Sequence, residues 1–194
     1  MLTPSTCLKE LNNLGVKFFT GVPDSLLRDF CECITDSVAK SDHVIAVNEG
    51  GAVGIAIGKY IATEAIPLVY MQNSGLGNAV NPLMSLASKE IYSIPMLLMI
   101  GWRGEPSTKD EPQHIHQGRS TLPMLKAMDI PYVILSQEQA EATRQLKDLI
   151  KMARELSCPV ALVVKKGLFE PYKKKKSNFL FPKNSLKILF RTLY

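Results

Sequence analysis

Short apolar runs alternate along the chain with longer segments in which apolar residues recur every three or four positions. The short runs suit strands buried on both faces, and the longer segments suit helices with one apolar face. The pattern predicts six strands with helices between them, at residues 16–20, 44–47, 68–71, 96–100, 132–135 and 160–164. Strands separated by helices are typical of βα units, so we predict an α/β domain with a doubly wound, mostly parallel six-stranded sheet and helices on both faces.

The same pattern predicts the helices and one long loop. Asp24 or Ser25 is expected to cap the helix that follows the first strand. The polar stretch 101–118 is predicted to be a loop, and loops beyond about 12–15 residues are usually functional or mobile. Further helices are predicted at residues 50–62, 76–87, 122–128 and 138–156. The helix at 50–62 contains four glycines, which favours close approach of another backbone, either in its own sheet or in a second subunit.

Composition and charge narrow the function classes. A length of 194 residues with 46% hydrophobic and 21% charged residues is typical of one ordinary globular domain. No apolar run reaches the roughly 18 residues of a membrane helix, and the first residues do not resemble a signal peptide, so we expect a cytoplasmic protein. Seven of the 23 basic residues follow Tyr172, which leaves 16 basic and 18 acidic residues before it, a net charge of −2. A nucleic-acid-binding domain is therefore not expected. The basic and apolar tail, residues 173–194, is expected to be disordered or atypical, and a membrane contact is not expected.

Polar and glycine-rich residues gather directly after the predicted strands. They occupy residues 21–25, 48–51, 72–78 and 101–105. In doubly wound sheets ligands bind beyond the carboxyl ends of the strands, so this clustering indicates a functional site at that edge.

Glu49 is the candidate for proton chemistry at this edge. It lies where an apolar strand ends and a glycine-rich helix begins, and burial there would raise the pKa of its carboxyl group and let it exchange a proton with a ligand. The alternative is an acidic residue that stabilises a helix N-terminus. The following turn, residues 72–78, offers amides and glycine N–H groups for a polar heterocycle or an anion, or is simply a turn with a capped helix.

The predicted polar loop contains several groups that could act on a ligand. Its histidines, His114 and His116, could move protons near neutral pH, but no third ligand is suitably spaced for a metal site, and none is predicted. A solvated lid without chemistry is the alternative. Other site classes are disfavoured: the sequence lacks a dinucleotide fingerprint, a P-loop and a Gly-x-Ser-x-Gly elbow.

Five segments, taken together, resemble the thiamine-diphosphate-dependent 2-oxo acid decarboxylases. They are Thr20-Gly-Val-Pro-Asp-Ser-Leu-Leu27, Asn48-Glu-Gly-Gly-Ala-Val-Gly54, Tyr70-Met-Gln-Asn-Ser-Gly-Leu-Gly-Asn78, Ile100-Gly-Trp-Arg-Gly-Glu-Pro106, and Lys109-Asp-Glu-Pro-Gln-His114 continuing to Gln117-Gly-Arg119. Within that superfamily they are most similar to the phosphonopyruvate decarboxylases, with the sulfopyruvate decarboxylases as a sister family. The resemblance covers residues 1–172.

The resemblance implies a pyrimidine-binding domain at residues 1–172. Glu49 then shares a proton with the pyrimidine ring of thiamine diphosphate and activates the cofactor. Asn73, Ser74 and Gly75 correspond to the turn that contacts the pyrimidine, and His114 corresponds to an active-site histidine for proton transfer.

The substrate that the resemblance implies carries a phosphonate group, and candidate contacts for it are chosen by charge. Arg103, Lys109 and Arg119 are candidates for the phosphonate group because a dianion needs nearby cations. Ser25 is a further candidate for substrate binding.

The chain also departs from the family. Single-chain members continue into a domain with a Gly-Asp-Gly motif that binds magnesium and the cofactor diphosphate, and this motif does not occur here. We therefore expect the diphosphate and Mg²⁺ to be held by a partner domain or subunit in trans, in a homo- or hetero-oligomer. The chain is either a natural subunit or a truncated product.

The function implied is decarboxylation of 3-phosphonopyruvate to phosphonoacetaldehyde and CO₂, in phosphonate biosynthesis. The alternatives are a sulfopyruvate decarboxylase subunit and a non-catalytic binding or regulatory module with the same fold.

Overall fold

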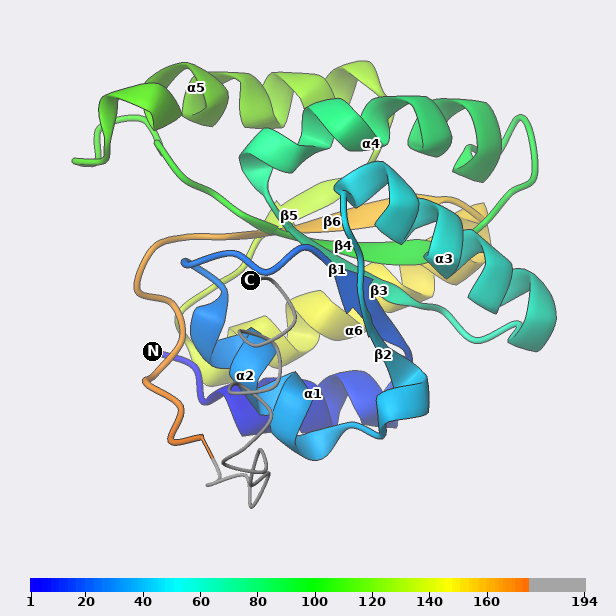
Figure 1. Cartoon of the computed structure of the whole chain (residues 1–194), viewed down its shortest axis with the longest axis horizontal. Coiled ribbons are helices and arrows are strands. Elements are labelled where there is room, and N and C mark those ends of the chain that lie inside the picture. The colour runs from blue at the N-terminus through cyan, green and yellow to red at the C-terminus, as the bar shows by residue number, and fades with distance from the viewer. Residues whose placement is uncertain (175–194) are drawn as a thin grey trace, which may run out of the picture.

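The computed structural model describes residues 1–174, whose strands form a single parallel sheet (Figure 1). The strands lie in the order β2-β1-β3-β4-β6-β5, and every neighbouring pair is parallel. The order reverses between β1 and β3, as in doubly wound sheets. The predicted fold class is confirmed. The strands are β1 (Phe19–Gly21), β2 (His43–Ile45), β3 (Leu68–Gln72), β4 (Met96–Gly101), β5 (Tyr132–Ile134) and β6 (Pro159–Val164).

Helices cover both faces of the sheet. One layer contains α1 (Pro4–Asn13), α2 (Arg28–Ser37) and α6 (Gln139–Leu156); the other contains α3 (Glu49–Thr63), α4 (Leu76–Pro82) and α5 (Pro112–Ala127) (Figure 1). Short helical turns are η1 (Lys40–Asp42), η2 (Asn73–Gly75) and η3 (Leu83–Ala87).

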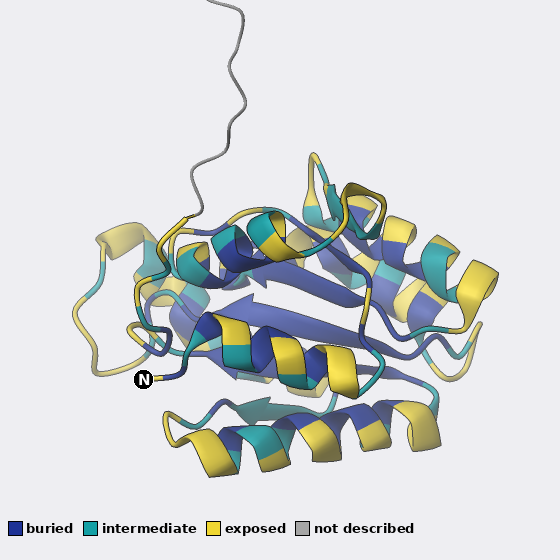
Figure 2. Cartoon of the chain, turned by 90° about the horizontal axis from the view of Figure 1, so that it is seen from below, coloured by how far each residue is buried: buried dark blue, intermediate teal, exposed yellow. Residues whose placement is uncertain are grey.

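Two hydrophobic cores lie on opposite faces of the sheet. Side chains alternate between faces along a strand, so in β3 Tyr70 packs with the α1, α2 and α6 layer while Met71 packs with the α3, α4 and α5 layer. Figure 2 shows the central strands buried between the helices. All of β4 and β6 is buried, which explains why these strands have continuous apolar sequences.

The structure corrects several predicted boundaries. The first strand begins at Phe19 instead of residue 16, and α2 begins at Arg28, with Leu27 and not Asp24 or Ser25 as its N-cap. The helix predicted at 76–87 changes at Pro82 into the π-helical turn η3, because proline lacks the N–H that an α-helical bond requires.

The largest difference concerns the stretch predicted to be a loop at residues 101–118. The helix α5 already begins at Pro112, so His114 and His116 lie on a helix. Proline is favoured at the first helical position, and the helix is held by a close backbone approach: a side chain at Gly118 would collide with the backbone of Gly104.

The two ends of the described chain meet. Leu2 forms an isolated parallel bridge with Phe169, and the Leu2 N–H donates to the Leu168 carbonyl at 2.8 Å. The ring of Phe169 stacks on Phe30 with centroids 5.2 Å apart. The predicted tail from residue 175 onward lies outside the described residues. Within residues 1–174, no helix is both long and apolar enough to cross a membrane.

Candidate active site

Glu49 lies in the first turn of α3, beyond the carboxyl edge of the sheet. Asn48 caps this helix through its side-chain oxygen, which accepts a hydrogen bond from the Gly51 N–H at 2.7 Å. The cap fixes where the helix begins and therefore where the Glu49 side chain starts. Glu49 itself is half-buried, so its carboxylate remains open to a ligand on one side.

The Glu49 carboxylate rests in a seat formed by η2 and the start of α4. The amide of Asn78 donates to Glu49 Oε2 at 2.8 Å. A Cβ atom at Gly75 would collide with the Glu49 carboxylate, and one at Gly50 would lie 2.7 Å from the Asn78 carbonyl oxygen. The seat therefore requires glycine at two positions, and it holds the carboxylate in a defined orientation.

Asn73 connects three elements at this edge. Its amide nitrogen donates to the Arg103 carbonyl and to Thr121 Oγ1, both at 2.8 Å, and its oxygen accepts from the Arg103 N–H at 3.2 Å. Asn73 is buried, and both amide hydrogens are used. We therefore expect Asn73 to position the site, whereas its neighbour Ser74 is exposed and accepts from Gln72 Nε2 at 2.7 Å.

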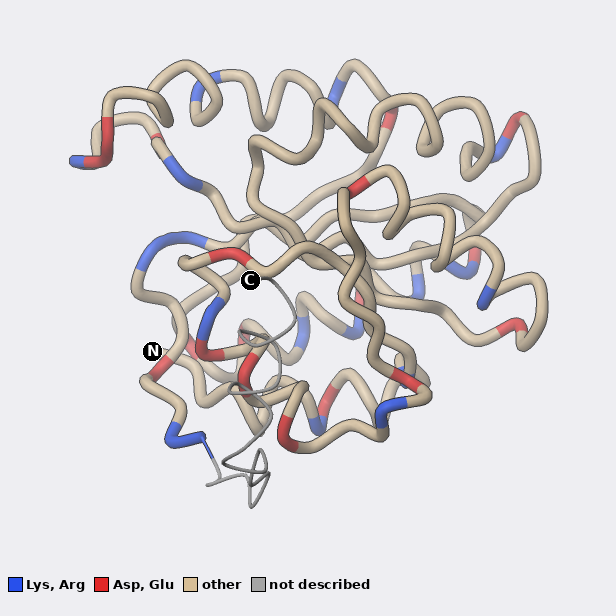
Figure 3. The backbone as a smooth tube through the Cα atoms, in the orientation of Figure 1, with Lys and Arg blue, Asp and Glu red and all other residues tan. Residues whose placement is uncertain are grey.

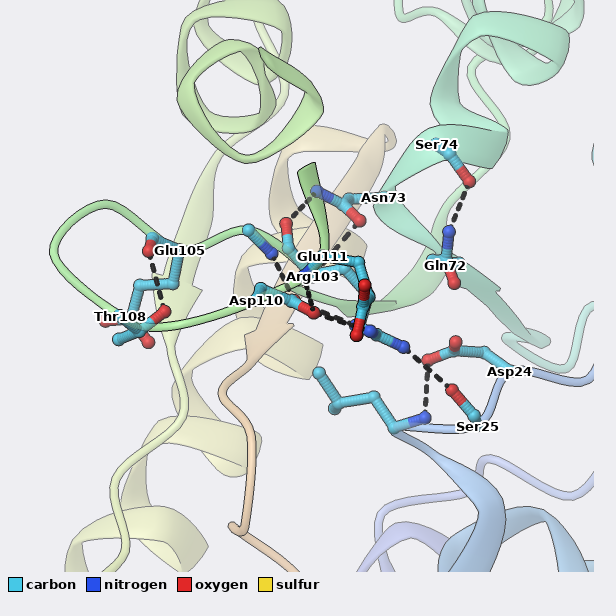
Figure 4. Close-up of polar contacts among 12 residues, drawn as sticks. Asp24, Ser25, Gln72, Asn73, Ser74, Arg103, Glu105, Thr108, Asp110 and Glu111 are labelled. Carbon is cyan, nitrogen blue, oxygen red and sulfur yellow. Dashed lines mark hydrogen bonds and ion pairs between the residues drawn. The ribbon is translucent and has the colours of Figure 1, made fainter. Parts of the chain in front are cut away.

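Arg103 follows β4 and is held by Asp110. The Arg103 Nε–Asp110 Oδ2 and NH2–Oδ1 distances are 2.9 and 2.5 Å, a bidentate pair. This hydrogen bonding holds the pKa of Asp110 well below its usual range, against the effect of burial. The third nitrogen, NH1, donates to Ser25 Oγ at 3.0 Å, as Figure 4 shows. The pair fixes the loop and directs one side of the guanidinium towards Ser25.

Asp24, predicted from the sequence only as a helix cap, is a buried carboxyl group. Its Oδ2 accepts from the N–H groups of Leu26 and Leu27 at 3.2 and 3.3 Å. Its Oδ1 is buried and has no hydrogen-bond partner within residues 1–174. Burial raises the pKa of Asp24, although the backbone hydrogen bonds and the Arg103 charge oppose this effect. The signal available in the sequence was a carboxylate directly after Pro23 at a strand end.

The remaining predicted residues lie around α5 and the loop before it. His114 is half-buried in the first turn of α5, and His116 is exposed. Lys109 is an exposed loop residue, and Arg119 is exposed and lines a cavity of about 330 Å³ between the loop and α5. Ser25 and Arg103 line a different cavity, of about 410 Å³. The structure thus brings Ser25 together with Arg103 and places Arg119 at another cavity.

The donor set at this edge suits one part of a cofactor better than another. Glu49 in its seat offers a carboxylate that could accept from a ring N–H, and the exposed Ser74 directly precedes Gly75, which abuts that carboxylate. In contrast, residues 1–174 contain no group of three or more His, Cys, Asp or Glu side chains that could hold a metal ion. The described residues therefore suit the organic ring of a cofactor better than a metal ion, and we assign no step to a metal held by these residues.

Comparison with known families defines the class of protein. Residues 5–129 match the family described as thiamine pyrophosphate enzyme, N-terminal TPP binding domain. The chain belongs to this family.

Individual relatives are named as two kinds of decarboxylase. The chain is 31% identical over 156 residues to the sulfopyruvate decarboxylase subunit alpha of Methanococcus maripaludis, covering 80% of this chain and 90% of that subunit. It is 35% identical over 135 residues to the phosphonopyruvate decarboxylase of Streptomyces hygroscopicus, covering 70% of this chain but 33% of that protein.

Solved structures share the fold at low sequence identity. The benzoylformate decarboxylase of Polynucleobacter necessarius superposes with a TM-score of 0.64 at 17% identity, over 90% of this chain and 32% of that one. A 4-hydroxybenzoylformate decarboxylase of Rhodococcus jostii gives a TM-score of 0.63, also at 17% identity, over 88% of this chain and 31% of that one. Both superpositions use about a third of the larger chain.

Proposed function

We propose that the chain is the pyrimidine-binding part of a thiamine-diphosphate-dependent decarboxylase. Its substrate would be a 2-oxo acid with a phosphonate or sulfonate group on the third carbon. The supporting observation is the seat of Glu49: a half-buried carboxylate, oriented by Asn78 and by the absence of a side chain at Gly75, at the ligand-binding edge of the sheet.

Glu49 holds the proton on which the cofactor's activation depends. Thiamine diphosphate, when bound, supplies a carbon nucleophile and an electron sink for loss of CO₂. Glu49 would share a proton with a nitrogen of its pyrimidine ring, and a partner covering this edge would remove water from the carboxylate. His114, half-buried at the start of α5, is the candidate for a later proton transfer to product.

A second subunit or domain would complete the site. The match covers 90% of a sulfopyruvate decarboxylase alpha subunit but 33% of a phosphonopyruvate decarboxylase. This difference in coverage supports an arrangement in which the cofactor diphosphate and Mg²⁺ are held by a partner in trans. The chain alone would then be inactive.

The names of the two kinds of relative suggest two candidate substrates. Decarboxylation of 3-phosphonopyruvate gives phosphonoacetaldehyde and CO₂, and the same step on sulfopyruvate gives sulfoacetaldehyde and CO₂. Identity is slightly higher to a phosphonopyruvate decarboxylase, and coverage is greater for sulfopyruvate decarboxylase subunits. We propose 3-phosphonopyruvate as the first candidate, and turnover of both acids measured side by side separates the two.

The experiment that tests the role of Glu49 is the Glu49→Gln variant, co-expressed with the diphosphate-binding subunit of the same organism. Glutamine preserves the acceptor for Asn78 but cannot exchange the proton, so CO₂ release should fall by at least about 100-fold. Glu155→Gln, an exposed substitution on α6, is the matched control and should retain activity. Full activity in Glu49→Gln would contradict the proposal.

A further inference from the structure

A cavity of about 410 Å³ lies at the carboxyl edge of the sheet, next to three strand ends. Ser25 follows β1, Arg103 follows β4 and Lys166 follows β6, and all three line the cavity together with Gly167 and Phe169. Its volume is within the range of about 300–1,000 Å³ that is usual for small-molecule sites. The site residues predicted from the sequence do not include any residue after β6.

Lys166 is the basic residue of this segment that faces the cavity. Its neighbour Lys165 forms an ion pair with Glu105, with Nζ and Oε1 2.5 Å apart, and lies over the Trp102 ring at 6.0 Å. Lys166 is exposed, and no ion pair is found for it within residues 1–174. Figure 3 shows the basic residues in the segment after β6, at the edge where β1 also ends.

Arg103 and Ser25 add directed hydrogen-bond donors to the same cavity. The bidentate pair with Asp110 prevents the guanidinium from turning, and its NH1 donates to Ser25 Oγ at 3.0 Å. An oxoanion placed here could accept from Arg103 NH1 and from the Ser25 hydroxyl at once.

One acidic residue also lines the cavity, and its oxygens are directed elsewhere. Asp29 Oδ1 accepts from the Tyr172 N–H at 2.9 Å, and its Oδ2 lies 3.7 Å from Arg28 NH2. Arg28 offsets the Asp29 charge, and Arg103 offsets that of Asp110. Lys166 therefore provides the positive charge that is not balanced by a neighbouring pair.

We propose that this cavity is the subsite for the tetrahedral oxoanion of the substrate, a phosphonate or a sulfonate, with Lys166 as its principal cation. The inference rests on the proposed function and specifies how the substrate class is recognised. Arg103 and Ser25 supply hydrogen bonds, and Lys109 and Arg119 are not required.

The subsite has a fixed relation to Glu49. The Asn73 side chain holds the backbone of Arg103 at one end of η2, and Gly75, at the other end of η2, abuts the Glu49 carboxylate. The cavity and the Glu49 carboxylate therefore belong to the same carboxyl edge of the sheet, and η2 connects them.

The first test needs neither cofactor nor partner. The full chain, labelled with ¹⁵N, is titrated with methylphosphonate and with methanesulfonate, with acetate as the planar control. We expect saturable shifts at Ser25 and Gly167 for both tetrahedral anions at millimolar concentrations, and their loss in Lys166→Gln but not in Lys147→Gln, an exposed lysine of α6. Shifts confined to Gly104 and Arg119, or no saturable shift, would overturn the subsite.

The second test uses the enzyme assembled with its partner. Lys166→Gln should raise KM by about tenfold or more with little change in kcat, because a charge that holds the substrate contributes to binding before and during the reaction. Lys166→Arg should restore most of this loss. The effect should be larger for the phosphonate dianion than for the sulfonate monoanion. An unchanged KM would overturn the subsite.

The two tests separate this inference from the proposed function. If the assembled enzyme releases no CO₂ from either acid, the decarboxylase proposal fails, while the titration still decides whether the cavity binds tetrahedral oxoanions. If decarboxylation occurs and Lys166→Gln changes neither the titration nor KM, only the subsite fails.

Discussion

The close contact between Gly75 and the Glu49 carboxylate lets us predict how strongly a substitution at Gly75 changes the reaction rate. In Gly75→Ala the new methyl group would lie 2.5 Å from Glu49 Cδ, whereas carbon atoms in contact are about 3.5 Å apart or more. The carboxylate must therefore move by about 1 Å, unless the backbone of η2 moves instead. Displacements of this size at reacting groups cost about 100-fold in rate.

We expect Gly75→Ala to lower kcat by about 100-fold in the enzyme assembled with its partner. Crowding of this kind should also reduce the free energy of unfolding by about 1–3 kcal/mol. The rate is measured as CO₂ release at saturating substrate, and stability by urea denaturation of the chain alone. The two measurements together distinguish a displaced carboxylate from a chain that is simply unfolded.

Gly77→Ala is the matched control for this prediction. A methyl group at Gly77 meets no atom within 4 Å, and alanine in a helix is favoured over glycine by about 0.5–1 kcal/mol. This variant should be slightly more stable and fully active. If Gly75→Ala were as active as Gly77→Ala, Glu49 would not need the orientation described above, and its assigned role would be wrong.

Two further predictions concern the buried carboxyl groups. In Asp110→Asn the Arg103 guanidinium loses its charged partner, so the free energy of unfolding at pH 7 should fall by about 1–3 kcal/mol. Because the pKa of Asp110 is lowered in the folded chain, this difference from wild type should shrink as the pH falls below about 4, and a difference independent of pH would contradict the reasoning. The pKa of Asp24 is shifted upward by burial, so the wild type should lose stability relative to Asp24→Asn as the pH rises above about 4. Urea denaturation at several pH values measures both effects, and the opposite trend for Asp24→Asn would show that Asp24 is not desolvated.

The architecture can be predicted from the sequence because the hydrophobic pattern of each central strand lies within that strand's own residues. The central strands β4 and β6, and β3 up to Met71, lack charged and amide side chains because both of their faces are buried. The edge strand β2 is only half-buried or exposed, so its pattern is weaker and its predicted end was too late. The start of α5 could not be predicted from periodicity, because the polar residues 112–120 are held as a helix by the contact between Gly104 and Gly118.

The site could be predicted in part for the same reason. Glu49 begins the helix that follows β2, and residues 73–75 directly follow β3, so both can be found by position. The pairing of Arg103 with Asp110 depends on how the loop folds back, so charge alone could not show that Arg103 is largely occupied. Lys166 stands next to Lys165 and ahead of a basic tail, and only the structure shows which lysine is paired with Glu105.

The hydrogen bonds of Asn73 make the carboxyl edge of the sheet a cooperative unit. They join η2, the segment after β4 and α5, so substitutions at Asn73 and Thr121, whose side chains are hydrogen-bonded to each other, should not be additive. Efforts to redesign substrate preference would therefore do better to vary the cavity wall at Lys166, which lies outside these hydrogen bonds, than to change the residues that hold the edge together. The same division would let evolution exchange one anionic substrate for another while the cofactor-facing residues stay unchanged.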